Sequence, residues 1–218
     1  MRIALIPVKE LTQAKERLRP VLADDARQAL VLAMLGDVIE AALTSGALDV
    51  VAVVTRDGGV LSMAEAAGAI ALDDSADGLN AALCAARSRF PEACELVVLP
   101  ADLPLALPEE VQQLVASAAD GPALALVASR DGGTNALALS PPGLIPFRFG
   151  PDSARRHEDE ARRLGVRPLR LSLPSLGLDV DTPADLALVD SLRERCRPRT
   201  AAALDLLRPA TAGSPEKE

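Results

Sequence analysis

The sequence predicts an α/β fold in which a mostly parallel sheet is covered by helices on both faces. Short apolar runs alternate with segments of helical periodicity along the 218 residues. The runs are almost continuously apolar, as in VVAVVT at residues 50–55, which is typical of strands buried on both faces. The length suits one core, so we expect a single domain at residues 1–196 and a flexible tail at 197–218, rich in Pro, Thr, Ala, Ser and Glu. Within that tail, Leu204, Leu206 and Leu207 could still form a short docking turn.

The first half of the chain begins with an apolar run at residues 3–8, the first expected strand, and a polar loop at residues 9–19. Asp24 and Asp25 then offer caps for a helix whose apolar face recurs at helical spacing as far as Ala42. The expected elements that follow are a strand at 50–55, a helix at 61–67, a helix at 79–90 and a strand at 96–99.

The second half repeats the alternation. A helix at 108–117 opens with proline in its first turn, which suits that position because proline lacks an N–H. The turn Asp131-Gly132-Gly133 separates two expected strands. The remaining expected elements are strands at 123–129 and 136–139, a helix at 153–164, an extended segment at 167–171 and a helix at 183–195.

Composition excludes several function classes. The chain has three Phe, no Trp and no Tyr, so it lacks the stacking platforms that bind single-stranded nucleic acid. A net charge of −8 without a basic block argues against duplex binding. No apolar stretch approaches a membrane span or a signal peptide, so we expect a cytoplasmic protein that binds neither nucleic acid nor membrane.

Any metal in this chain should be held by carboxylates. His157 is the sole histidine, and Cys84, Cys94 and Cys196 lack the spacing of a ligand set, so we expect reduced, mostly structural thiols. Carboxylate oxygens favour a hard cation, and the sequence therefore points to Mg²⁺.

Ligands of an open parallel sheet bind at the carboxyl ends of its strands, so the polar residues that follow each strand are the candidates. Asp102 stands in the segment PADLP after the strand at 96–99, where the flanking prolines keep it out of a helix. Asp179 and Asp181 lie two residues apart, and on an extended segment both face the same side. Two open alternatives are that Asp102 only begins a turn and that Asp181 or Thr182 caps the next helix.

The loop after the first strand carries Lys9, Lys15, Arg17 and Arg19, which suit a triphosphate, although a solvated basic loop is the alternative. Neither a Walker sequence nor a GxGxxG follows any strand, which excludes a P-loop ATPase and the standard dinucleotide fingerprint.

Two glycine-containing segments could bind an anion. Residues 129–135, SRDGGTN, place successive N–H groups and a hydroxyl at the sheet edge, unless they form an ordinary hairpin. Residues 149–153, FGPDS, open a helix whose N-terminus suits a phosphate. His157 shares a face with Ser153 and could touch that phosphate, but we expect an exposed position for it.

Read together, the segments IPVKELTQAKERL, VVAVVTRD, DDSADGLNAAL, VVLPADLP, SRDGGTNALAL, FGPDSARRH and GLDVDTPADL resemble the CofC/FbiD family, the guanylyltransferases of coenzyme F-420 biosynthesis. The resemblance covers residues 3–192. It implies a Rossmann-like sandwich of the nucleotide-diphospho-sugar transferase type. It further implies an enzyme that joins GMP from GTP to a three-carbon phosphorylated acid and releases pyrophosphate.

The resemblance also implies roles for individual residues. Catalysis would rest on Lys9, Asp102 and Asp181, and Mg²⁺ on Asp102 and Asp181, with Asp179 as the alternative or supporting ligand. The residues implied to bind GTP are Lys15 and Arg17 at the phosphates and Thr55 and Asn80 near the base or ribose. Those implied to hold the acid are Thr134, Gly150 and Ser153.

The chain departs from the family pattern at two places. Glu16 stands where a small hydroxyl residue is usual, and Asp152 and Ala154 stand in an acceptor loop that usually reads closer to FGxGS followed by an aromatic residue. The second departure leaves three acids open: phosphoenolpyruvate, 2-phospho-L-lactate and 3-phospho-D-glycerate. A composition rich in Ala, Arg and Leu is typical of a high-GC bacterial source and favours phosphoenolpyruvate.

Two other functions share the expected fold. A molybdopterin-type nucleotidyltransferase would begin with a glycine-rich loop, which IPVKELTQAKERL does not match. A catalytically silent nucleotide-binding protein would have little need for Lys9, Asp102 and Asp181 together. A homodimer and transfer of the product to the next transferase of the pathway are further expectations.

Overall fold

The computed structural model describes residues 1–119 and 121–207, built around a seven-stranded sheet in the order β3-β2-β1-β4-β6-β5-β7. Within the described residues only β6 runs against its neighbours, because it pairs antiparallel with both β4 and β5. The mostly parallel α/β sheet expected from the sequence is confirmed. The strands are β1 (Arg2–Pro7), β2 (Val50–Thr55), β3 (Ile70–Asp73), β4 (Glu95–Val98), β5 (Ala123–Ala128), β6 (Thr134–Ser140) and β7 (Leu169–Arg170).

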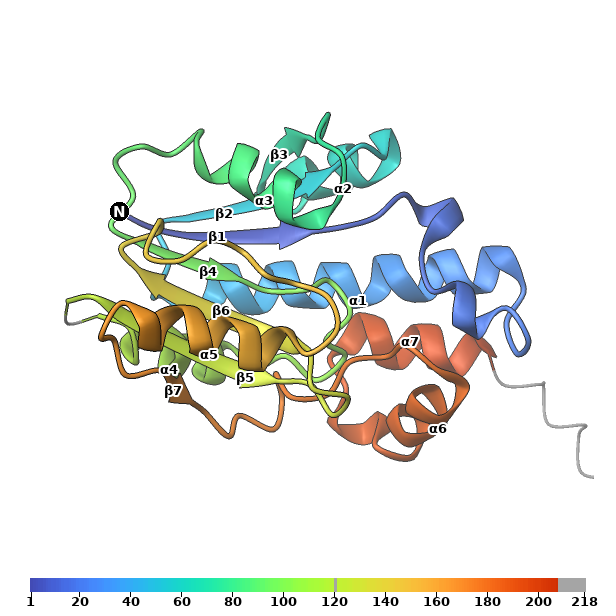
Figure 1. Cartoon of the computed structure of the whole chain (residues 1–218). Coiled ribbons are helices and arrows are strands. Elements are labelled where there is room, and N and C mark those ends of the chain that lie inside the picture. Colours follow the sequence, from blue (N-terminus) through green and yellow to red (C-terminus); the bar gives the residue numbers. More distant parts are fainter. Residues whose placement is uncertain (120, 208–218) are drawn as a thin grey trace, which may run out of the picture.

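Helices cover both faces of the sheet (Figure 1). One core contains residues of α1, α2, α4, α6 and α7, and the opposite core contains residues of α3 and α5. The helices are α1 (Asp24–Thr44), α2 (Gly58–Ala66), α3 (Leu79–Arg87), α4 (Pro108–Ala116), α5 (Ser153–Arg163), α6 (Pro183–Ser191) and α7 (Pro198–Leu207), with short 3₁₀ turns η1 (Leu11–Gln13), η2 (Glu16–Leu18) and η3 (Arg193–Arg195). None of the helices in the described part of the chain combines the length and apolarity needed to cross a membrane.

Strand β1 shows why its sequence is continuously apolar. Ala4 and Ile6 enter one core, while Ile3 and Leu5 enter the other, and all four side chains are fully buried. Side chains alternate between the two faces of a strand, so a strand covered on both faces has no position left for a polar residue.

Two strands depart most from the expectation. Strand β3, Ile70–Asp73, was not expected; it is short and lies at the edge of the sheet, where Ile70 and Asp73 are exposed and the two residues between them are half-buried. Strand β6 begins at Thr134, two residues before the expected start, because Thr134 pairs with Ala128 across the hairpin.

The tail expected from residue 197 is wrong for residues 198–207, which form α7 and pack beside α1 (Figure 1). Asp37 of α1 is fully buried and accepts hydrogen bonds from the backbone N–H and the hydroxyl of Thr200, at 2.8 and 2.7 Å. Leu204 buries itself against the core of the same face. The rest of the expected tail, residues 208–218, lies outside the described residues.

The reversed strand brings its first residues to the edge where the parallel strands end. Leu96 of β4 faces Leu139, and Val98 faces Leu137, so the amino end of β6 lies beside the carboxyl end of β4. Thr134 and Asn135 therefore join the residues that follow β1, β2 and β4 at the ligand edge of the sheet.

Candidate active site

Three carboxylates meet at this edge. Asp102 follows β4, and Asp179 and Asp181 precede α6. Each offers an oxygen within 4.8 Å of the oxygens of the other two, so the structure brings together all three predicted metal ligands.

The donor set fits a hard divalent cation. Asp102 Oδ1 is buried without a hydrogen-bond partner among the described residues, a costly state for a carboxylate oxygen unless a ligand satisfies it. Mg²⁺ is bound in proteins through one or two carboxylates together with substrate phosphates, and this cluster offers such oxygens.

Lys15 joins two of these carboxylates. Its ammonium contacts Asp102 Oδ2 and lies 2.5 Å from Asp181 Oδ1. Burial of the ammonium acts to lower the pKa of Lys15, but the charges of Asp102 and Asp181 outweigh it and raise that pKa above its ordinary value. The backbone of Lys15 is left-handed, with φ of 52°, and this bend aims its side chain at the cluster.

The alternative role of Asp181 as a helix cap is taken by its neighbour. Thr182 is the N-cap of α6: its hydroxyl accepts from the N–H of Asp185, and the Asp185 carboxylate accepts from the N–H of Thr182. This capping box satisfies the first turn of the helix and leaves the Asp181 carboxylate to the cluster.

Asp179 is held by Asn135, whose amide donates to Asp179 Oδ1 at 3.2 Å. Burial, and after it the charge of Asp102, raises the pKa of the Asp179 carboxyl. Asp179 is not among the residues that line the adjacent cavity, so it supports the cluster from behind.

A cavity of about 520 Å³ opens beside Asp102 and Asp181, between the ends of β1, β2 and β4 and the start of α3. Apolar walls from Val8, Val54 and Leu79 surround it. The charged residues that line it are Lys9, Lys15, Arg56, Glu10, Asp74, Asp77, Asp102 and Asp181.

The loop that carries Lys15 is fastened on two sides. Arg27 of α1 is fully buried and donates to the carbonyl oxygens of Leu11 and Ala14. From the other side Asp57 Oδ2 accepts from the N–H of Leu11 at 3.1 Å, while its Oδ1 caps α2. These bonds add to those of the short 3₁₀ turns η1 and η2 in satisfying the backbone groups of the loop.

Three predicted GTP ligands have their side chains outside the cavity lining. Thr55 is fully buried, and its hydroxyl accepts from the N–H of Asp57 at 3.1 Å. The Asn80 amide bonds both to the carbonyl oxygen and to the N–H of Phe149, at 3.1 and 2.9 Å. Arg17 is exposed and contributes, after stronger hydrogen bonds, to lowering the pKa of Asp131. The buried Thr55 and the half-buried Asn80 are thus engaged with the backbone, and Arg17 lies toward Asp131 of the β5–β6 turn.

The residues predicted to hold the acid also meet. The hydroxyls of Thr134 and Ser153 lie 2.9 Å apart, and the N–H of Ser153 donates to the carbonyl oxygen of Gly150 at 3.1 Å. Gly150 has φ of +124°, which favours glycine. His157 lies behind them, fully buried, so the exposed position expected for it is wrong.

Comparison with known proteins identifies the family. A family model described as guanylyl transferase CofC like matches residues 1–190. The chain belongs to this family.

Relatives and solved structures agree with that assignment. The phosphoenolpyruvate guanylyltransferase of Rubrobacter xylanophilus is 44% identical over 203 residues, covering 91% of this chain and 98% of the relative. The protein of the same name from Roseiflexus castenholzii is 41% identical, covering 84% and 85%. The structure of a putative nucleotide-diphospho-sugar transferase from Desulfovibrio desulfuricans superposes with a TM-score of 0.77 at 19% identity, covering 95% and 94%, which confirms the expected fold.

Sequence reasoning about this CofC-like guanylyl transferase missed three charged residues that line the cavity: Glu10, Asp74 and Asp77. Arg56 directly follows β2, so it belongs to the candidates that the strand-end rule gives. Asp74 and Asp77 follow β3, and they were missed because β3 itself was not expected.

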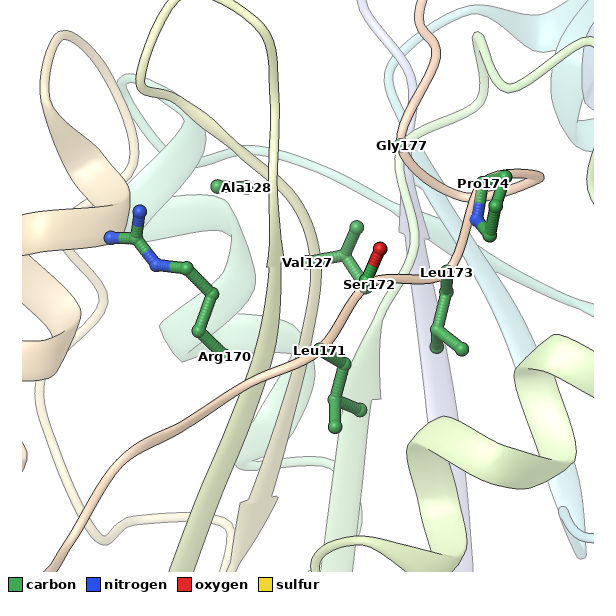
Figure 2. Close-up of a pocket in the computed structure, with 8 residues that line it drawn as sticks. All are labelled: Val127, Ala128, Arg170, Leu171, Ser172, Leu173, Pro174 and Gly177. Carbon is green, nitrogen blue, oxygen red and sulfur yellow. The ribbon is translucent and has the colours of Figure 1, made fainter.

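A second cavity, of about 410 Å³, lies along β5 and the segment after β7 in the CofC-like chain. Figure 2 shows Arg170 directed away from Ser172 and Pro174; its guanidinium bonds to Glu158 of α5 at 2.7 Å. None of the predicted site residues lines this cavity.

Proposed function

We propose that this chain transfers GMP from GTP to phosphoenolpyruvate and releases pyrophosphate, with Mg²⁺ held by Asp102 and Asp181 and supported by Asp179. One observation carries the proposal: the carboxylate cluster borders the cavity lined by Lys9, Lys15 and Arg56, and Asn135 joins it to the strand that carries Thr134. Asp102 and Asp181 line the cavity, and Asn135, next to Thr134, holds Asp179. A nucleotide and an acid bound on either side would present their phosphates to the same carboxylates.

Phosphoenolpyruvate is preferred over the two other acids because of the relatives. The proteins from Rubrobacter xylanophilus and Roseiflexus castenholzii are both named for that substrate, and both align with most of this chain. Guanine as the base likewise rests on the family description.

The cavity suits a triphosphate despite the net charge of −8. Lys9, Lys15 and Arg56 line it together with five carboxylates, two of which would hold Mg²⁺, and these cations with the metal would offset the repulsion between two polyanionic substrates. The apolar walls formed by Val8 and Leu79 suit the nucleoside.

The reaction requires no general base, because the attacking oxygen of the acceptor phosphate is already an anion. The new bond joins that oxygen to the α-phosphorus of GTP, and the bond from the α-phosphorus to the bridging oxygen breaks as pyrophosphate leaves. The chain's residues act by positioning the two phosphates and by stabilising charge on the leaving group. Bound Mg²⁺ would supply Lewis-acid stabilisation of the phosphate oxygens.

The metal assignment predicts the effect of Asp102→Asn, which keeps the size of the side chain but removes its charge. We expect the rate of acceptor-dependent pyrophosphate release to fall by at least ~10²-fold, the scale of losing one preorganised electrostatic group. The affinity for Mn²⁺ in the presence of GTP, measured by titration with paramagnetic detection, should fall in parallel.

The matched control is Asp25→Asn, at an exposed position in the first turn of α1 outside the cluster. It should change neither the rate nor the metal affinity, and circular dichroism should show that both variants are folded. Full activity and unchanged Mn²⁺ binding in Asp102→Asn would show that Asp102 holds no metal.

A further inference from the structure

His157 is a buried polar group that the proposed reaction does not use. It is the sole histidine of the chain, it is fully buried, and it lies on α5 one turn after Ser153. Its ring stacks edge-on against Phe149, with the centroids 4.9 Å apart. Both ring nitrogens nevertheless have hydrogen-bond partners, so the ring is more than apolar filling.

The backbone determines which nitrogen carries the proton. The N–H of Arg148 donates to His157 Nε2 at 2.9 Å. A peptide N–H can only donate, so Nε2 must be the unprotonated, accepting nitrogen. The proton of the neutral ring therefore lies on Nδ1, which is 3.1 Å from Thr134 Oγ1 and donates to it.

The direction of this hydrogen bond determines which of the Thr134 and Ser153 hydroxyls donates to the other. Thr134 is buried, so the proton of its hydroxyl needs an acceptor. Among the described hydrogen bonds that acceptor is Ser153 Oγ, 2.9 Å away. If Ser153 donated instead, the Thr134 oxygen would accept twice and its buried proton would have no acceptor, which is costly. Thr134 therefore donates to Ser153. The Ser153 side chain is itself almost fully buried, and none of the described hydrogen bonds takes its proton, so that proton is left for a ligand that contacts this residue.

We propose that His157 is a positioning residue that makes Ser153 a hydrogen-bond donor to the anionic acid, through the series Arg148 N–H, His157, Thr134 and Ser153. This inference rests on the proposed function, because it takes Thr134 and Ser153 as the acceptor site. Ser153 also stands in the first turn of α5, where the helix dipole favours a negatively charged ligand.

The charge state of the ring supports this arrangement. Burial, and after it the charge of Arg148, lowers the pKa of His157 to about 4, while Glu160 acts in the opposite direction. The ring is therefore neutral at pH 7, with one donor and one acceptor, as the series requires.

The sole histidine makes the tautomer measurable. We would label a chain without a histidine tag with ¹⁵N-histidine and record the two ring-nitrogen shifts at pH 7. The inference predicts a protonated Nδ1 and an unprotonated Nε2. A protonated Nε2, or an average of the two tautomers, would overturn it.

Kinetics provide a second test with a matched pair of variants. His157→Asn can place an amide nitrogen near the position of Nδ1 and keep the donor to Thr134. His157→Gln reaches toward Nε2 and keeps only the contact with the Arg148 N–H. We expect the KM for phosphoenolpyruvate to rise ~10-fold in His157→Gln, and only two- to threefold in His157→Asn, with the KM for GTP unchanged in both.

Ser153→Ala separates this inference from the proposed function. It should raise the KM for phosphoenolpyruvate and abolish the further effect of His157→Gln in the double variant. An unchanged KM in Ser153→Ala would refute the acceptor site itself. A raised KM in Ser153→Ala together with equal effects of the two His157 variants would refute the role of His157 alone.

Discussion

At the scale of single residues, neighbouring side chains of the site divide the tasks between them. Thr182 and Asp185 cap α6, which releases Asp181 to the carboxylate cluster. Thr134 and Asn135 divide in the same way: Thr134 bonds to His157, and Asn135 holds Asp179. Adjacent residues of a strand face opposite sides, so one strand end serves both halves of the site.

The buried His157 predicts how stability depends on pH. Its pKa is about 4 in the folded protein, against 6.5 for an unperturbed histidine, so between these values the unfolded chain binds a proton that the folded chain does not. The free energy of unfolding should therefore decrease as pH falls from 6.5 to 4, by about 3 kcal/mol from this residue. Above pH 6.5 this contribution is fully present.

Urea unfolding of the wild type and of His157→Asn at pH 7 and about pH 4.5 measures that contribution. Carboxylates titrate equally in both proteins, so the difference between their losses of stability isolates the ring. The wild type should lose about 2 to 3 kcal/mol more than the variant between the two pH values. Parallel losses would contradict the buried neutral ring.

The sequence identified the carboxylates but not the hydrogen bonds around them. Asp102 could be predicted because it follows a strand at the ligand edge, and Asp181 because it stands two residues from Asp179 on an extended segment. The Thr55 hydroxyl bonds to an N–H only two residues along the chain, which is a local contact. The Asn80 amide, in contrast, bonds to the backbone of Phe149, 69 residues away, and no local pattern encodes that contact. The burial of His157 likewise requires Phe149 and Thr134 to be in place.

At the scale of elements, α7 shows how a polar-looking segment becomes part of the fold. It includes Pro198 and Thr200, residue types with low helix propensity, so the local sequence does not indicate a helix. The segment also lies beyond residue 190, where the family match ends. The buried Asp37 carboxylate satisfies the N–H groups of Arg199 and Thr200 in its first turn. A side chain from α1 thus caps a helix 163 residues later in the sequence, which single-sequence reasoning cannot detect.

Loss of this cap predicts a defect in stability. Asp37→Ala leaves the buried donors of Thr200 without an acceptor and should lower the free energy of unfolding by roughly 2–4 kcal/mol. Thr200→Val removes only one hydroxyl bond and should cost about 1 kcal/mol. Both values are measured by urea unfolding at neutral pH.

No α7 residue lines the cavity of about 520 Å³ beside Asp102 and Asp181. The KM for GTP should therefore stay the same in both variants under conditions where they are folded. A change of less than about 0.5 kcal/mol in Asp37→Ala would contradict the docking of α7 through Asp37.

At the scale of the whole molecule, one reversed strand organises the site. The carboxyl ends of β1, β2 and β4 supply the side proposed to bind the nucleotide, and β6, running against them, supplies the side proposed to bind the acceptor from its amino end. The fold class was predictable because buried strands are apolar on both faces. The start of the strand that carries Thr134 was predicted two residues too late, because Thr134 and Asn135 do not belong to an apolar run.

The most direct test of the central claim is transfer of GMP to each acid. The tag-free protein is incubated with GTP, Mg²⁺ and either phosphoenolpyruvate, 2-phospho-L-lactate or 3-phospho-D-glycerate, and both pyrophosphate and product mass are measured. We predict acceptor-dependent pyrophosphate release, a product with GMP joined to the acid through a diphosphate, and the highest kcat/KM with phosphoenolpyruvate. Failure of all three acids to release pyrophosphate from GTP, with the protein folded and Mg²⁺ present, would contradict the proposed activity.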